Sequence, residues 1–504
     1  MSKIKSLILG SAATLVAVAG AQAADLPVKA KAVQYVKICS LYGAGFYYIP
    51  GTDTCIKLGG YIQADVNIAS NNYNNPLSGG SFAGVFTGGG TYAGVNGNHN
   101  HDSDSFTTRS RAQLNLDTRT ATEYGVVRTY WSSNFEHSTG FGPSSGNLTV
   151  DFAFVQFAGF TFGKAISNFT TPWSAYTANV NTSAYIGGQD NATGITQAAY
   201  TFQFGNGVSA QLGVEDNKTI QRAPILNAAF TPFGVVTGST GAPSSSSLIA
   251  SGAYGTGGQL SPDIVGNIRI DQAAFTAQLS GALHNVNANY YTADERDGRP
   301  SDKWGFAVSG GLLLKNLPTG PGDKFSVDLT YTEGAPKYVI GGTVGNGYNI
   351  YGSSDVGYES FAAGSLFDGV YGTGTNIELT KVWGVRASFL HNWTPNWETG
   401  VFGGYTHVDY NGNATALMNT PAILAALGAG SSYNPDFNIW QIGTRTAWTP
   451  VKNLTFSGEV LYTKIDQTSV GTITLPAGGF NPTAAYEFKD QGVFTGNLRV
   501  RRTF

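Results

Sequence analysis

Positively charged side chains recur at alternate positions along parts of this sequence. Arg109 and Arg111 are followed, at the same alternation, by Gln113, Asp117 and Arg119. Alternate residues of a β-strand share one face, so this spacing would place the guanidinium groups in one row. A guanidinium keeps its charge in a confined site, and its planar fork pairs with carboxylates. Such a row would either set up a field that orders dipolar molecules or pair with neighbouring acids and stabilise the sheet.

Histidines offer the remaining catalytic and metal-binding chemistry. The candidate bases His137, His284, His391 and His407 stand in no recognisable motif with serine, so no activated nucleophile is predicted. The run from His99 to Asp104 carries donors for a divalent metal, but a solvated loop is the simpler interpretation of its Gly/Asn-rich surroundings. We predict no catalytic site, no metal and no cofactor.

The N-terminus has the three-part layout of a secretory signal peptide. Lys3 and Lys5 precede an apolar run that reaches Ala19, and Ala21-Gln22-Ala23 forms a small-x-small cleavage site. A short buried helix is the alternative. We predict cleavage after Ala23 and hence an exported protein.

The two cysteines, Cys39 and Cys55, enclose a turn-rich segment that contains Gly43, Pro50 and Gly51. An even cysteine pair in an exported protein predicts a disulfide. Closing such a loop contributes roughly 3 kcal/mol in the chain-entropy model. A metal site fits less well, because no histidine or further cysteine stands nearby to complete it.

The amino-acid composition limits the classes of protein to which this chain can belong. Only 12% of the 504 residues are charged, yet mean hydropathy is −0.09, because Gly (67), Phe (29), Tyr (26) and small polar residues replace the charge. A soluble domain carries roughly 25% charged residues. The 12% aromatic content opposes disorder. Beyond the N-terminus no apolar run approaches the ~18 residues of a spanning helix. The net charge of −3 gives no indication of nucleic-acid binding.

From Ile56 onward, apolar and polar residues alternate in segments of about ten residues, which predicts half-wet β-strands. Short turns and long loops alternate between them, so an antiparallel meander would place all turns at one end. The sixteen predicted strands are 56–68, 106–120, 124–136, 149–158, 160–168, 195–204, 208–216, 264–272, 274–285, 304–315, 324–333, 378–393, 397–409, 436–449, 453–465 and 489–504.

The apolar face of these strands can meet lipid. A soluble sandwich is the alternative, but its wet face would carry many Lys and Glu, whereas this one is largely Gln, Asn, Ser, Thr and Gly. Lipid forbids open sheet edges, so the sheet must close, and about sixteen tilted strands enclose an aqueous channel. We predict an all-β transmembrane antiparallel β-barrel over 56–504, with short periplasmic turns and long external loops. A periplasmic segment over 24–55 and a signal peptide over 1–23 precede it.

Several stretches resemble the alphaproteobacterial general porins. They are Cys39–Gly43, Cys55–Tyr61, Arg109–Leu114, Val382–Gly384 and His391–Trp397. The closing Phe504 matches the terminal Phe by which outer-membrane barrels are presented to the insertion machinery. Arg502 departs from the pattern, because an aromatic often stands two places before the end; at the periplasmic interface it could snorkel.

The resemblance implies a homotrimer of sixteen-stranded pores in the Gram-negative outer membrane, in contact with lipid and lipopolysaccharide. It also implies passive diffusion of small hydrophilic solutes and ions. In the family the third long loop folds into the lumen; here that loop is Thr170–Gly194, with Trp173, Tyr176, Tyr185 and Asp190. A surface loop packed on its neighbours is the alternative.

Charges that line a narrow point set its selectivity. Alternation assigns these cations to the lumen: Lys57, Arg109, Arg111, Arg119, Arg128, Arg269, Arg386, Arg445, Arg499 and Arg501. For the constriction we predict Arg109, Arg111, Arg128, Arg386 and Arg445, with Asp190 and Asp65 as the facing acids. Such a basic wall would orient dipolar solutes. Alternatively, each arginine pairs with a neighbouring acid and only stabilises the wall. An outer-membrane enzyme and an adhesive or structural barrel are the rival functions.

Overall fold

The computed structural model describes residues 37–69, 106–139, 145–173, 177–179, 186–218, 221–229, 255–292, 294–341, 346–475 and 482–504. The predicted signal peptide, the motif from His99 to Asp104, Tyr176 and Tyr185 lie outside these residues. Within them, no helix has the length and hydrophobicity needed to cross a membrane.

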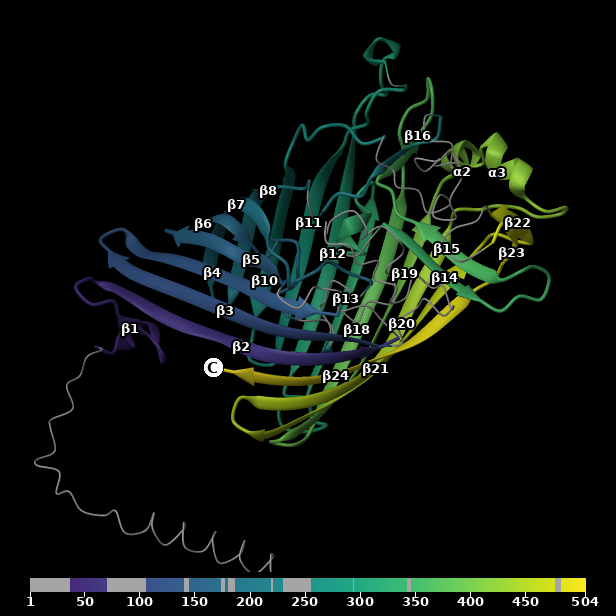
Figure 1. Cartoon of the computed structure of the whole chain (residues 1–504). Helices are drawn as coiled ribbons and strands as arrows, with labels where there is room; N and C mark the ends of the chain where they lie inside the picture. Colours follow the sequence, from purple (N-terminus) through teal and green to yellow (C-terminus); the bar gives the residue numbers. More distant parts are fainter. Residues whose placement is uncertain are drawn as a thin grey trace, which may run out of the picture.

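Sixteen antiparallel strands form a closed barrel (Figure 1). They are β2 (Thr54–Ile68), β3 (Phe106–Thr122), β4 (Gly125–Ser138), β5 (Asn147–Phe157), β6 (Phe160–Ala165), β7 (Ile195–Gly205), β8 (Val208–Glu215), β10 (Asp263–Asp271), β11 (Phe275–Val286), β12 (Lys303–Lys315), β13 (Lys324–Glu333), β18 (Lys381–Thr394), β19 (Trp397–Asp409), β20 (Phe437–Val451), β21 (Leu454–Gln467) and β24 (Gln491–Thr503). All sixteen predicted strands are confirmed, with their ends shifted by at most three residues.

The barrel closes where β24 pairs with β2, from Tyr61 opposite Thr503 to Ile68 opposite Gly496. Beyond this ladder, Phe504 and Gly60 exchange two backbone hydrogen bonds, of 3.1 and 3.3 Å. Gly60 has a φ of +155°, and a Cβ there would lie 2.0 Å from the Gln113 carbonyl oxygen. Glycine is therefore required where the first strand meets the end of the last.

The two faces of the sheet differ as the alternation predicts. Outward side chains are apolar and exposed, such as Ile62, Leu279 and Val460. Inward side chains such as Gln63 and Asp65 are polar and buried by their neighbours. Aromatics mark both ends of the outer face: Trp393 and Trp397 flank a short turn, and Trp304 lies beside a long loop.

The predicted disulfide is confirmed: Cys39 and Cys55 are bonded, with their Cα atoms 6.1 Å apart. It closes a segment that contains η1 (Ser40–Tyr42) and β1 (Tyr47–Tyr48). β1 pairs with the start of β2, on the edge that β24 does not reach. Figure 1 shows this segment beside the C-terminus, at one end of the barrel.

The long loops fold into elements of their own that the sequence did not predict. They are a four-stranded sheet of β14 (Gly347–Gly352), β15 (Ser360–Ser365), β22 (Thr472–Leu475) and β23 (Ala484–Phe488), a three-stranded sheet of β9 (Ile225–Asn227), β16 (Gly369–Tyr371) and β17 (Glu378–Leu379), the helices α2 (Gly412–Met418) and α3 (Pro421–Ala426), and the 3₁₀ turns η5 (Glu295–Asp297) and η6 (Pro336–Tyr338). Loop residues such as Tyr348, Phe361 and Phe367 share one buried cluster with the inward side chains Val408 and Ile465. This apolar layer therefore packs against the inside of the wall at the loop end.

Candidate pore lining and constriction

The described residues of the segment between β6 and β7 leave the wall and contact strands across the lumen. Thr171 donates a hydrogen bond of 3.1 Å to Asp328 on β13, and the backbone N–H of Ile186 donates to Gln441 on β20. Asn179 donates through its backbone N–H to Glu459 on β21 and through its side chain to Asn497 on β24, the latter at 2.9 Å. The inward-folded third loop is thus confirmed for its described residues.

Glycines allow the returning half of this loop to lie directly on β18. Gly187 has a φ of +87°, and a Cβ there would come within 2.5 Å of the Val385 carbonyl oxygen. A Cβ on Gly188 would come within 2.6 Å of the Arg386 guanidinium. A side chain at Gly187 would meet the β18 backbone, and one at Gly188 would displace the Arg386 guanidinium.

Arg386 and Arg445 hold the loop by its backbone. Arg386 donates to Asp328 Oδ2 and to the Gln189 carbonyl oxygen, each at 3.0 Å. Arg445 donates to Glu398 at 2.8 Å and to the Thr177 carbonyl oxygen at 3.3 Å. Arg386 is almost fully buried, with 4% of its side chain exposed. We call this side of the barrel, formed by β13 and β18 to β21, the loop-lined wall.

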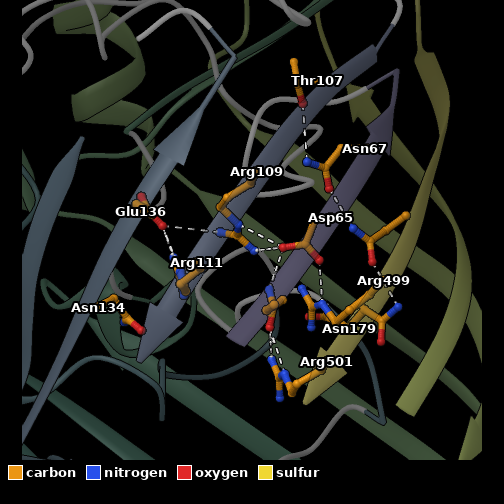
Figure 2. Close-up of polar contacts among 12 residues, drawn as sticks. Asp65, Asn67, Thr107, Arg109, Arg111, Asn134, Glu136, Asn179, Arg499 and Arg501 are labelled. Atoms are coloured by element: carbon orange, nitrogen blue, oxygen red, sulfur yellow. Dashed lines mark hydrogen bonds and ion pairs between the residues drawn. The ribbon is translucent and has the colours of Figure 1, made fainter. Parts of the chain in front are cut away.

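A second charge cluster joins β2, β3 and β24 (Figure 2). Asp65 accepts from Arg109 at 2.9 Å and from Arg499 at 2.6 Å, so two guanidinium groups share one carboxylate. Arg499 also donates to the backbone carbonyl of Asn179 and so holds the inward loop from this side. Arg111 pairs with Glu136 on β4 at 2.7 Å, and Arg109 lies 4.0 Å from the same carboxylate.

The row continues toward the short turns. Arg501 donates to the amide oxygen of Gln63 at 2.8 Å and lies 4.4 Å from the Tyr61 ring centroid. Asp117 pairs with both Arg119 and Arg128, at 3.1 and 3.0 Å. We call the group formed by Lys57, Arg119, Arg128 and Arg501 the turn-end basic wall. Each member belongs to β2, β3, β4 or β24.

Cations outnumber acids on the described inner faces of β2 to β5 and β24. The cations are Lys57, Arg109, Arg111, Arg119, Arg128, Arg499 and Arg501, and the acids are Asp65, Asp117, Glu136 and Asp151. The excess of three positive charges gives this side of the lumen a positive potential.

Buried polar groups fasten further loops at the outer end. His284 Nδ1 lies 2.8 Å from Asp263 and Nε2 lies 3.3 Å from Asp368, while Tyr338 donates to Asp263 at 2.7 Å. Burial raises the pKa of the loop carboxyl Asp368, although the His284 ring opposes the shift. Burial lowers the pKa of the neighbouring Lys337 ammonium to about 8, against the attraction of Asp368 and Asp190. His284, considered above as a base, thus serves as a bridge between strand and loop.

The structure brings Asp65, Arg109 and Arg111 into one cluster and places Arg386 and Arg445 on the loop-lined wall. Arg128 lies apart, with Asp117. Asp190 lies on the loop itself, buried, and its Oδ1 accepts from the Ala192 backbone N–H at 2.7 Å. Sequence reasoning missed the anchoring pair Asn179–Glu459, whose members are 280 positions apart and share no local pattern. It placed Arg499 on the lumen face but not in the cluster.

A family model described as a porin subfamily matches residues 25–497. Porin Omp2b of Brucella abortus is 35% identical over 222 residues, covering 42% of this chain and 54% of that protein. Porin Omp2b of Brucella suis is 33% identical over 221 residues, covering 42% and 52%. The chain therefore spans about half the length of the curated relatives it matches.

Among solved structures, the outer membrane channel DcaP of Acinetobacter baumannii superposes with a TM-score of 0.57. The match covers 91% of this chain and 99% of that one, at 16% identity. At that identity the likeness shows the shared barrel fold alone.

Proposed function

The chain belongs to the porin subfamily, and from this premise we propose that it forms a water-filled channel for passive diffusion of small hydrophilic solutes and ions through the outer membrane. One observation carries the proposal: a closed sixteen-stranded barrel has a polar inner face and a loop tied across its lumen. A barrel of this size is too wide to be filled by its own side chains. The inward loop supplies the narrowing that a sieve needs.

We place the constriction between the inward loop and the cluster of Asp65, Arg109 and Arg111. Arg499 supports this position, because it touches both Asp65 and the loop backbone. Arg128 belongs to the region nearer the turns. Arg386, Arg445 and Asp190 act from behind, as supports of the loop. The excess of cations favours anions over cations of equal size.

Planar-bilayer recording of the folded protein tests the channel. We expect steady conductance steps, and their absence from properly folded protein would overturn the proposal in favour of an adhesive or structural barrel. Replacing Arg111 and Arg128 by Gln should shift the reversal potential toward cations. An unchanged potential would mean that these arginines only brace the wall.

We further propose a homotrimer, embedded among outer-membrane lipid and lipopolysaccharide and inserted by the barrel-insertion machinery through Phe504, after removal of residues 1–23. Light scattering in detergent tests the trimer, and deletion of Phe504 should lower the yield of inserted barrel.

Membership of a porin family favours a channel over an outer-membrane enzyme. Turnover in a lipase assay would support the alternative function of an outer-membrane enzyme.

A further inference from the structure

The segment closed by the disulfide lies at the short-turn end of the barrel, on the lumen-facing side of β2. We call this end of the lumen the turn-end mouth. Cys55 and Lys57 share the lumen-facing alternation of β2 with Gln63 and Asp65. The Lys57 stem runs along Gly45 of the segment, so closely that a Cβ there would lie 3.3 Å from Lys57 Cε. Phe46 is buried against both cysteines. The segment is therefore part of the mouth's lining, at the turn end of β2 and β3.

Charge is out of balance at this mouth. Lys57, Arg119 and Arg128 surround one carboxylate, that of Asp117. Asp117 accepts from Arg119 Nε and Nη2, which leaves Arg119 Nη1 without a hydrogen-bond partner among the described residues. The ammonium of Lys57 likewise has no carboxylate within the described part of the chain. About three-tenths of each arginine side chain remains exposed, 29% for Arg119 and 30% for Arg128.

Aromatic rings hold these cations in place. The Phe46 ring centroid lies 4.9 Å from Arg119 Cζ and 5.8 Å from Lys57 Nζ, and the Tyr42 centroid lies 5.6 Å from Arg119 Cζ. On the other side, Arg128 lies 5.2 Å from the Tyr130 centroid and 5.5 Å from that of Phe154. A ring attracts a cation but does not neutralise it. The cations are thus fixed in position, and together they carry more positive charge than the single Asp117 carboxylate balances.

We propose that this mouth is a binding site for small organic carboxylates with a flat apolar body. The carboxylate would pair with Arg119 Nη1 and the Lys57 ammonium. The planar body would stack on the guanidinium group of Arg119 or Arg128, whose side chains are each about three-tenths exposed, because a guanidinium accepts flat groups. The disulfide matters because it fixes Tyr42 and Phe46 beside these cations. The proposal rests on the channel function above and adds a class of solute to it.

Titration calorimetry on folded protein in detergent tests the site without any need for conductance. Benzoate is the probe, acetate lacks the flat body, and benzamide lacks the charge. We expect saturable benzoate binding, with acetate and benzamide each at least about tenfold weaker because each loses one half of the contacts. Equal binding of benzoate and acetate would overturn the requirement for a flat body. No measurable benzoate binding would overturn the site.

The variants Arg119→Gln and Arg119→Lys separate charge from geometry. R119Q should weaken benzoate binding about tenfold, and R119K should restore only part of it, because an ammonium lacks the planar fork. Arg269→Gln is the matched control, since Arg269 also faces the lumen but pairs with Asp271 on β10 at 2.7 Å. An equal loss in R269Q and R119Q would show a general field effect and overturn a local site.

The double variant Cys39→Ser/Cys55→Ser tests the role of the disulfide. It should weaken benzoate binding while the barrel still folds, and unchanged binding would remove the segment from the site. Parallel bilayer recordings keep the two proposals distinct. Conductance without benzoate binding overturns the site alone, whereas benzoate binding without conductance overturns the channel alone.

Discussion

Two sides of the barrel use the same residue type for different tasks. On the loop-lined wall, Arg386 has 4% of its side chain exposed and donates to the backbone of the inward loop. On the turn-end basic wall, Arg128 has 30% exposed and stacks on Tyr130. What lies opposite decides the contacts: an arginine covered by the inward loop anchors that loop, whereas Arg128 pairs with Asp117 and stays partly exposed.

The largest effect is expected from Arg386→Gln. This variant removes one partner of a buried ion pair, leaves Asp328 without its cation and releases the Gln189 carbonyl. Breaking such a pair costs about 3–5 kcal/mol. Urea unfolding in lipid vesicles measures the free energy, with Arg128→Gln as the exposed control. Equal losses in the two variants would contradict the distinction between the walls.

A pH effect is expected from Lys337, in the outer-loop layer that also holds Asp368. Burial holds the pKa of Lys337 at about 8, below the ~10.4 of an exposed lysine. Between these values the unfolded chain binds the extra proton, so stability rises with pH across that window. The gain is at most about 3 kcal/mol, at 1.36 kcal/mol per pKa unit. The free energy of unfolding, measured by urea titration, should therefore rise more from pH 8 to pH 10 in the wild type than in Lys337→Met. An equal rise in the two proteins would disprove this contribution of Lys337.

Gly188→Ala tests how closely the loop is seated. Its new methyl group would lie 2.6 Å from the Arg386 guanidinium, so either the loop or the arginine must move. Overpacking of this kind costs about 1–3 kcal/mol. Urea midpoints and single-channel noise report the change, and Gly310→Ala is the control, because a Cβ there meets nothing within 4 Å. A silent G188A would mean that the loop adapts freely.

The smallest effect in free energy concerns ion selectivity. Replacing Arg128 and Arg501 by Gln removes two half-buried charges from the turn-end basic wall, and we expect roughly a twofold fall in the chloride-to-potassium permeability ratio. Arg445→Gln removes a charge from the loop-lined wall whose side chain is only 16% exposed, against 30% for Arg128, and should shift the ratio less. Reversal potentials in a salt gradient compare the variants. A larger shift of the reversal potential in R445Q than in the double variant would contradict the distinction between the two walls.

The strands were predictable because a period of two is a local property that each strand carries in its own sequence. The disulfide followed from the same kind of local reasoning. The division between arginines that anchor the loop and arginines that stay partly exposed was not predictable, since Arg386 and Arg128 both stand on the polar side of the same kind of alternation. Their difference arises from a loop that crosses the lumen to reach Glu459 and Asn497. The sheets and helices of the outer loops were missed for the same reason, because their apolar residues find partners only on the assembled wall.

The seam between β2 and β24 has a consequence for the order of assembly. It joins strands that are more than four hundred positions apart, and Gly60 and Phe504 complete it. The other fifteen ladders of the barrel each join barrel strands that follow one another along the chain, so they can form one hairpin at a time. The ladder between β2 and β24 joins the first barrel strand to the last, and such distant pairings are slow to form. Until the seam closes, the sheet exposes two long edges on which other chains could pair. Pairing of β2 with β24 is thus the step that removes both free edges and converts an aggregation-prone open sheet into a closed barrel.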